Sequence, residues 1–177
     1  EILKSEAQKL NEAFARYIRH KTPLITLKTA MTLDGKIAPE PSPIEVAGPG
    51  NVTRGWITSD FARKHVQQLR HQHDAILVGV GTILADDPLL TDRTGLPRRR
   101  PLLRVILDSR LRLPPESRLV QHVNADVLVV CSILDIDRKR ALENRGVRVE
   151  QIAAARPDVV VVDAGGHHPD EDLVGAK

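Results

Sequence analysis

The chain has 177 residues, a length that suits one domain with a hydrophobic core of its own. Apolar residues make up 41% and charged residues 28% of the chain, which is the balance of a soluble globular protein. The net charge of +3 and the pI of about 9.3 favour anionic ligands, but they fall well short of the pattern of a nucleic-acid-binding protein.

The single cysteine, Cys131, excludes a disulfide within the chain and a cysteine-based zinc site. It lies in an apolar run, so we expect it to pack as a small hydrophobic residue. We find no signal peptide and no apolar run long enough to cross a bilayer. We therefore expect a cytoplasmic protein with no membrane and no nucleic-acid partner.

Apolar periodicity predicts the elements in chain order. Residues 5–20 form an amphipathic helix, with Ala7, Leu10, Phe14 and Ile18 on one stripe. Leu24–Met31 reads as the first strand, followed by a turn at Asp34–Gly35 and a long loop over 39–50. A further helix is expected after a cap at Thr58 or Ser59, with Phe61, Val66 and Leu69 facing inward. Two more helices are expected at 82–86 and 135–144. Further strands are expected at 74–79, 102–107, 126–131, 147–152 and 159–162.

Near-continuous apolar strands that alternate with helices predict an α/β fold. We expect three layers, with a mostly parallel central sheet and helices on both faces. Ligands of such folds bind at the carboxyl ends of the strands.

The segment Gly79–Thr82 follows a strand and opens a helix. Its two glycines would let the backbone approach a phosphate or cofactor closely. The third glycine of the dinucleotide fingerprint is absent, with Leu84 in its place, so a simple tight turn is the alternative.

Charged residues nearby have both functional and structural interpretations. One of Asp86 and Asp87 could accept hydrogen bonds from ribose hydroxyls, or both could cap a helix. Arg70 and Arg93 could clamp a phosphate, or could simply be solvated. The run Arg98–Arg100 reads as a solvated loop.

The segment Asp108–Arg110 follows another strand and leaves two cofactors open. The carboxylate of Asp108 could bind a ribose 2′-hydroxyl, as in NAD sites, whereas Ser109 with Arg110 could hold the 2′-phosphate of NADP. A plain turn is the third interpretation. His71 and His73 point to different faces of a helix, and we assign no metal site.

Several of these motifs occur together in the order of a known family. The chain resembles, over roughly Leu3 to Val120, the reductase domain of the bifunctional riboflavin-biosynthesis deaminase/reductase. The motifs that carry the resemblance are Leu27–Lys36, Trp56–Ser59, Arg70, Gly79–Arg93 and Ile106–Ser109.

The resemblance implies a dihydrofolate-reductase-like fold and the NADPH-dependent reduction of 5-amino-6-(5-phosphoribosylamino)uracil to its ribitylamino counterpart. It also implies a small-molecule ribose-phosphate substrate and a homodimer. Catalytic roles would fall on Asp86 and on Lys28. Cofactor contacts would fall on Ala30, Trp56, Thr82, Asp86 and Ser109. Substrate contacts would fall on Arg54, Arg70, Leu90 and Arg93.

The chain departs from the family at Arg54, where a serine is usual, and it has no clear Glu-Gly-Gly segment. A zinc deaminase would need more than one cysteine. We therefore expect residues 1–22 to be a linker helix from an upstream deaminase domain, and residues 23–177 to be a reductase domain incomplete at its C-terminus. The alternatives are a dihydrofolate reductase and a non-catalytic nucleotide-binding fragment.

Overall fold

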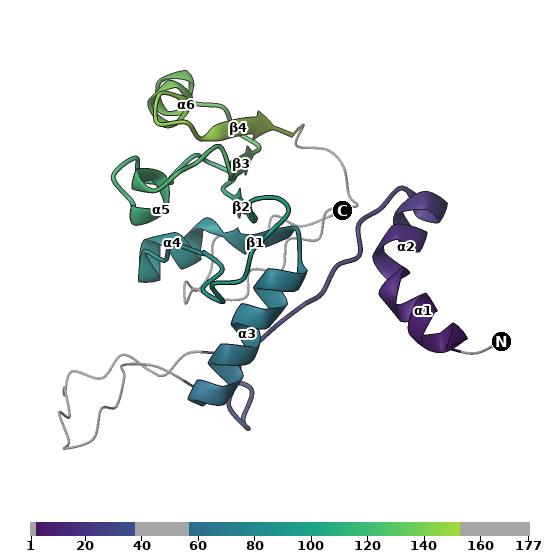
Figure 1. The fold of residues 1–177 in the computed structure, drawn as a ribbon. Coiled ribbons are helices and arrows are strands. Elements are labelled where there is room, and N and C mark those ends of the chain that lie inside the picture. Colours follow the sequence, from purple (N-terminus) through teal and green to yellow (C-terminus); the bar gives the residue numbers. More distant parts are fainter. Residues whose placement is uncertain (1–2, 38–56, 153–177) are drawn as a thin grey trace, which may run out of the picture. The chain divides into compact units, whose positions relative to one another are not determined.

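The computed structural model describes residues 3–37 and 57–152 (Figure 1). The chain divides into two compact units, Glu1–Ala30 and Met31–Lys177, which are described separately here. The predicted loop at 39–50, the predicted strand at 159–162 and the candidate residues Arg54 and Trp56 lie outside the described residues.

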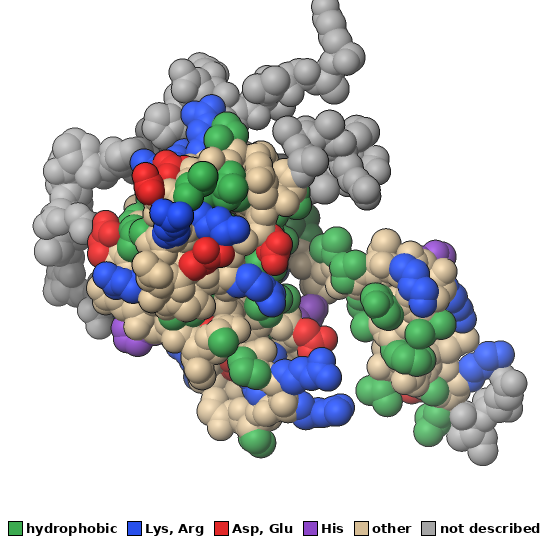
Figure 2. Space-filling view, turned by 90° about the horizontal axis from the view of Figure 1, so that it is seen from above, with side chains coloured by type: hydrophobic (Ala, Val, Ile, Leu, Met, Phe, Trp, Pro, Cys, Tyr) green, Lys and Arg blue, Asp and Glu red, His purple; other side chains and the backbone are tan. Residues whose placement is uncertain are grey.

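The first unit contains two helices, α1 (Lys4–Leu10) and α2 (Glu12–His20), where the sequence predicted one. The break falls at Asn11, whose side-chain amide donates to the Ala7 carbonyl at 2.9 Å. Asparagine favours helix ends because its side chain competes for backbone hydrogen bonds. No side chain of either helix is buried, so the apolar stripe has no partner within this unit; Figure 2 shows its apolar side chains at the surface.

The strand predicted at Leu24–Met31 is wrong for the structure, because these residues form neither helix nor strand. Ile25 is 82% exposed and Leu27 is 69% exposed. A strand exists only through hydrogen bonds to a neighbouring strand, and no described strand pairs with this segment. High β-propensity alone therefore did not decide its conformation.

The second unit opens with the predicted turn. The Gly35 N–H donates to the Thr32 carbonyl at 2.9 Å, and the Thr32 N–H donates to the Lys36 carbonyl at 2.8 Å. Gly35 has φ +81°, a conformation that glycine adopts without a steric cost.

Helix α3 (Asp60–Gln72) begins where the sequence predicted, because Ser59 caps it. The Ser59 hydroxyl accepts from the Ala62 N–H at 3.3 Å, and Asp60 places a negative charge in the first turn. Val66 and Leu69 are half-buried as expected, but Phe61 is 84% exposed, so its predicted inward position is wrong.

Four strands form an all-parallel sheet in the order β1-β2-β3-β4, which confirms the α/β prediction (Figure 1). The strands are β1 (Ala75–Gly79), β2 (Leu103–Leu107), β3 (Val127–Cys131) and β4 (Arg148–Gln151). The helices after α3 are α4 (Val80–Asp86), α5 (Arg118–Gln121) and α6 (Ile136–Glu143). The sequence did not predict α5.

One face of the sheet carries the core. The side chains that alternate toward this face in β2, β3 and β4 are buried, and they form one cluster with Val80 and Ile83 of α4, Leu119 of α5 and Leu142 of α6. Strands that follow one another in a single direction with right-handed crossovers place all their connecting helices on the same face. The cluster of α4, α5 and α6 residues agrees with that rule.

The opposite face is less covered by the described residues. Leu77 of β1 is 57% exposed, and Val105, Leu128 and Val130 are only half-buried. The prediction of a buried strand at 74–79 is therefore wrong for its outward residues, because β1 is the edge of the described sheet. No helix of the described residues is long and apolar enough to span a membrane.

Candidate active site

Two of the predicted cofactor residues of the second unit, Thr82 and Ser109, lie just beyond the carboxyl ends of strands. Gly79 ends β1 beside Leu107, which ends β2. Helix α4 follows Gly79 directly and carries Thr82, half-buried, in its first turn. Ser109 lies two residues beyond β2 and is exposed. Thr82 and Ser109 thus follow the ends of neighbouring strands, where an α/β sheet presents its loops to a ligand.

The backbone after β2 is held firmly. The Ser109 carbonyl accepts from the Ile133 N–H at 2.8 Å and from the Ser132 N–H at 3.2 Å, which ties the end of β2 to the loop after β3. The Asp108 carboxylate turns into the protein and accepts from the Leu113 N–H at 2.7 Å. Because Asp108 is buried, its carboxylate is not presented to a ribose, whereas Ser109 and Arg110 are exposed.

The two adjacent carboxylates at the end of α4 have different environments. Asp87 adopts φ +41°, and its Oδ1 accepts from the Arg118 N–H at 2.8 Å, so it caps α5. Asp86 is exposed and has no hydrogen-bond or ion-pair partner among the described residues. Asp87 therefore has the structural role, and Asp86 has a carboxylate available to a ligand.

The predicted substrate residues Arg70, Leu90 and Arg93 come together where α3 meets the loop after α4. Arg70 Nη1 donates to the Thr91 carbonyl at 3.0 Å, and the Arg93 N–H donates to Gln67 Oε1 at 3.1 Å. Burial, and the positive charge of Arg93 nearby, lower the pKa of Arg70. Arg70 Nε is buried without a hydrogen-bond partner among the described residues. The Arg70 and Arg93 charges lie close enough to influence each other, and two such cations favour an anionic ligand.

Leu90 contributes differently from the arginines. Its side chain is buried in the core, so only its backbone can contact a ligand. It has φ +55°, which is unusual for a bulky residue. Backbone strain of this kind is often found in functional loops.

Asp92 lies between the two site residues Thr91 and Arg93 and is 7% exposed. Burial tends to raise the pKa of this carboxyl, but hydrogen bonds from the Thr94 backbone, His71, the Thr94 hydroxyl and Arg98 overcome it and hold the pKa of Asp92 well below its usual range.

This depressed pKa predicts an acid sensitivity. An unfolded aspartate titrates near pH ~3.9, so the stabilisation by Asp92 is fully present above about pH 4 and is lost as the pH falls through the lower, folded pKa. In denaturant unfolding, we expect Asp92→Asn to be less stable than the wild type at neutral pH, with the difference narrowing below about pH 4. A difference that stays constant with pH would contradict this role of the charge.

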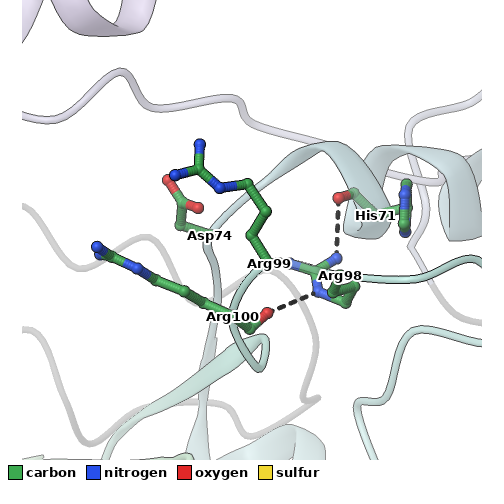
Figure 3. A pocket seen from close by; sticks show the side chains of 5 residues that line it. All are labelled: His71, Asp74, Arg98, Arg99 and Arg100. Atoms are coloured by element: carbon green, nitrogen blue, oxygen red, sulfur yellow. Dashed lines mark hydrogen bonds between the residues drawn. The ribbon is translucent and has the colours of Figure 1, made fainter.

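An open cavity of about 470 Å³ is lined by His71, Asp74, Arg98, Arg99 and Arg100 (Figure 3). Arg98 was expected to be solvated, and this is wrong. Its guanidinium donates to the carbonyls of Arg70, His71 and His73 at 2.7–2.9 Å and to Asp92 at 3.1 Å. A cation at the last carbonyls of a helix satisfies them and suits the helix dipole. Arg98 is thus engaged with the protein itself.

The structure does not assemble all the predicted residues. Lys28 and Ala30 belong to the first unit, which is not placed relative to the second. Arg54 and Trp56 lie outside the described residues. No group of three His, Cys, Asp or Glu residues within 3–37 and 57–152 is arranged to hold a metal ion. Burial, and after it the charge of Asp108, raise the pKa of the Cys131 thiol, which agrees with a packing role.

Sequence reasoning missed Asp92, His71 and Arg104 as residues that shape this site. Arg104 is buried in β2, and its guanidinium donates to the Leu89 carbonyl at 3.0 Å, at the start of the site loop. An arginine inside an apolar strand was the available signal, because such a residue must have buried partners. Asp92, between Thr91 and Arg93, had no comparable signal in the sequence.

A parallel α/β sheet with polar loops at its carboxyl edge is the architecture of proteins that bind small ligands at that edge. The family follows from comparison: residues 23–164 match the model of the RibD C-terminal domain. The chain belongs to this family, and the resemblance seen in its sequence is confirmed.

Individual relatives support this family membership. The chain is 37% identical over 174 residues to the riboflavin biosynthesis protein RibD of Actinobacillus pleuropneumoniae, covering 98% of this chain and 41% of that protein. It is 36% identical over 125 residues to a 2,5-diamino-6-ribosylamino-4(3H)-pyrimidinone 5′-phosphate reductase of Methanothermobacter thermautotrophicus, covering 70% of this chain and 52% of that protein.

Two solved structures are similar. Acinetobacter baumannii RibD superposes with a TM-score of 0.66 at 30% identity, covering 85% of this chain and 39% of that one. A diaminohydroxyphosphoribosylaminopyrimidine deaminase/5-amino-6-(5-phosphoribosylamino)uracil reductase of Thermotoga maritima superposes with a TM-score of 0.60 at 33% identity, covering 85% and 44%. The chain thus spans about two fifths of the length of these RibD proteins.

Proposed function

We propose that this domain reduces 5-amino-6-(5-phosphoribosylamino)uracil to 5-amino-6-(5-phosphoribitylamino)uracil with NADPH, a step of riboflavin biosynthesis. Family membership supports the reductase class, since one relative is named as a pyrimidine ribosylamino phosphate reductase. The observation that carries the substrate class is that the loop bearing Arg93 is attached to α3 at Arg70 and Gln67, which brings two positive charges near each other, as suits a phosphate monoester.

In this proposal the residues of the chain bind and orient the reactants. Arg70 and Arg93 hold the ribose phosphate, and the Leu90 backbone contacts the same ligand. Thr82 and Ser109 line the cofactor end of the site, together with Ala30 and Trp56. When bound, the cofactor would supply a hydride to C1′ of the sugar, and opening to the ribityl chain would break the C1′–O4′ bond with a proton taken up at O4′. Fixing the two reactants in one geometry is the main catalytic contribution of the protein.

The choice of NADPH over NADH rests on the end of β2. The Asp108 carboxylate is committed to the Leu113 N–H, while Ser109 and Arg110 are exposed beside it. An exposed serine–arginine pair suits a 2′-phosphate. We expect Arg110→Glu to raise the KM for NADPH by about 10–100-fold, with little effect on the KM for NADH, because one charge-assisted contact is worth roughly 1.5–3 kcal/mol. Equal changes for both cofactors would contradict the assignment.

Asp86 is the proposed catalytic residue, because its exposed carboxylate is free to accept hydrogen bonds from a sugar, and Lys28 is a second candidate. We expect Asp86→Asn to lower kcat by about 10–100-fold while the free energy of unfolding stays within about 0.5 kcal/mol, because the side chain is exposed. Asp87→Ala is the matched control. It removes the side-chain oxygen that caps α5 and should cost about 1–2 kcal/mol of stability with kcat nearly unchanged. The reverse pattern would exchange the roles of the two aspartates.

The larger organisation is also proposed. RibD relatives are longer, and one similar structure is named as a deaminase/reductase, so residues 1–22 would link an upstream deaminase to a reductase domain over 23–177. A three-layer, dihydrofolate-reductase-like sheet and a homodimer complete the proposal. The arginine pair favours this substrate over dihydrofolate.

The test is oxidation of NADPH, followed by absorbance, with either the phosphoribosylaminouracil or dihydrofolate as substrate. Turnover with the first alone supports the proposal. Turnover with dihydrofolate, or binding of NADPH without any turnover, would replace it by one of the two alternatives.

A further inference from the structure

The loop that carries Arg93 is attached to α3 on both sides of Asp92. The preceding carbonyl, of Thr91, accepts from Arg70 Nη1 at 3.0 Å. The following N–H, of Arg93, donates to Gln67 Oε1 at 3.1 Å. The position of Arg93 relative to Arg70 is therefore set by how this short loop lies against the last two turns of α3.

The carboxylate of Asp92 forms the centre of that attachment. Its Oδ2 lies 2.8 Å from His71 Nδ1 and 3.1 Å from Arg98 Nη1, and its Oδ1 accepts from the Thr94 N–H at 2.9 Å. The side chain is 7% exposed, and its oxygens are already engaged with the protein. Asp92 is thus placed to act on its neighbours and not on a ligand.

Arg98 closes the network from the other side. Its Nη1 and Nη2 together donate to three carbonyls at the C-terminal end of α3, one of which, the His71 carbonyl, is shown in Figure 3. Nη1 also donates to the Asp92 carboxylate. The result is a continuous chain of contacts from the end of α3 through Arg98 and Asp92 to the Arg93 loop.

The network also changes the electrostatics at this end of α3. Arg70, Arg93 and Arg98 bring three cations to one end of α3; Asp92 contacts Arg98 directly and acts on Arg70 through its charge. The Arg93 charge opposes the ionisation of Arg70, and the Asp92 charge favours it. A buried carboxylate between like charges reduces their repulsion before any ligand arrives.

We infer that Asp92 is a positioning residue, which holds Arg93 beside Arg70 so that the pair is preorganised for a phosphate group. The inference rests on the proposed function of those two arginines, and it assigns to Asp92 a role that acts through them. Preorganisation of this kind lowers the cost of binding, so its loss falls on the affinity for the phosphorylated substrate.

The test compares two substrates that differ only in the phosphate, the phosphoribosylaminouracil and its phosphate-free counterpart, with the 177-residue chain and saturating NADPH. Asp92→Asn should raise the KM for the phosphorylated substrate by about tenfold, the effect of roughly one charge-assisted contact, with kcat changed less than threefold. The KM for the phosphate-free substrate should not change. Inhibition by inorganic phosphate should weaken in parallel, and Asp92→Glu should restore part of the loss.

Asp87→Ala, which removes the cap of α5 next to the same loop, is the matched control and should leave both KM values unchanged. Equal increases for both substrates in Asp92→Asn would mean general damage and would overturn the inference. An unchanged KM would overturn it as well. If Arg93→Ala raises the KM for the phosphorylated substrate and Asp92→Asn does not, only the positioning role fails. If Arg93→Ala has no effect, the phosphate assignment itself fails and the positioning role fails with it.

Discussion

Replacing Arg70 and Arg93 together by alanine is expected to lower kcat/KM for the phosphoribosylaminouracil by roughly 10²–10⁴-fold, because each charge-assisted contact to a phosphate contributes about 1.5–3 kcal/mol. The loss should fall mainly on KM, since a phosphate remote from C1′ is bound alike in the ground and transition states. Steady-state NADPH oxidation over a range of substrate concentrations measures both parameters.

The single variants separate binding from structure. Arg93 offers the cleaner test, because its side chain is exposed and only its backbone is needed by Gln67. Arg70 also supports the Thr91 carbonyl, so Arg70→Lys is preferable to alanine there. Arg99→Ala removes an exposed arginine that takes no part in the proposed site and should leave kcat/KM unchanged. A similar loss in Arg99→Ala would point to general electrostatic attraction instead of a phosphate site.

Arg104→Leu is expected to lower the free energy of unfolding by about 3–5 kcal/mol, because it leaves a largely buried charge without its partner. The Arg104 guanidinium lies 2.6 Å from Asp126 Oδ1, and it also donates to the carbonyls of Leu89 and His122 at 3.0 Å. The side chain is 2% exposed, so water cannot replace these contacts. Chemical denaturation followed by circular dichroism measures the change.

A surface ion pair is the control for Arg104. Lys139 and Glu143 lie 3.6 Å apart on α6 and are partly exposed, so Lys139→Ala should cost no more than about 0.5 kcal/mol. The double variant Arg104→Leu/Asp126→Leu should recover part of the stability, because an apolar pair can replace a buried ion pair. A cost below about 1 kcal/mol for Arg104→Leu would contradict its role in anchoring Leu89 and β3.

Much of the second unit could be predicted from local signals. The expected cap at Thr58 or Ser59 located the start of α3, and α6 lies within the helix predicted at 135–144. The apolar runs located β2, β3 and β4 to within about a residue or two of their ends. These features depend on residues close in sequence, so pattern reasoning reaches them.

The failures share a dependence on distant partners. Leu24–Met31 has the composition of a strand, but no described strand pairs with it. Phe61 falls on the apolar side of its helix pattern, yet no residue within 3–37 and 57–152 covers it. In the sequence, Arg98 cannot be distinguished from any other arginine of a proline-rich loop. Only the structure shows that it donates to the last carbonyls of α3. Sequence patterns show the chemistry of each residue, whereas its burial depends on which distant residues pack against it.

The candidate site divides in the same way. Arg70, Arg93, Thr82 and Ser109 were recognisable from motifs, and the structure places them at the α3 end and at the carboxyl edge of the sheet. The two aspartates at the end of α4 could not be told apart until Asp87 was seen to cap α5. Asp92 had no motif, and its role emerges only from the three groups that surround it.

The most direct test of the proposed reduction uses NADPH that carries deuterium at its transferable position, with the phosphoribosylaminouracil as substrate. The product, analysed by mass spectrometry and NMR, should be the ribitylamino compound with one deuterium at C1′, formed in equal amount to the NADPH consumed. A folded chain that consumes no NADPH, or deuterium found anywhere but C1′, would contradict the account.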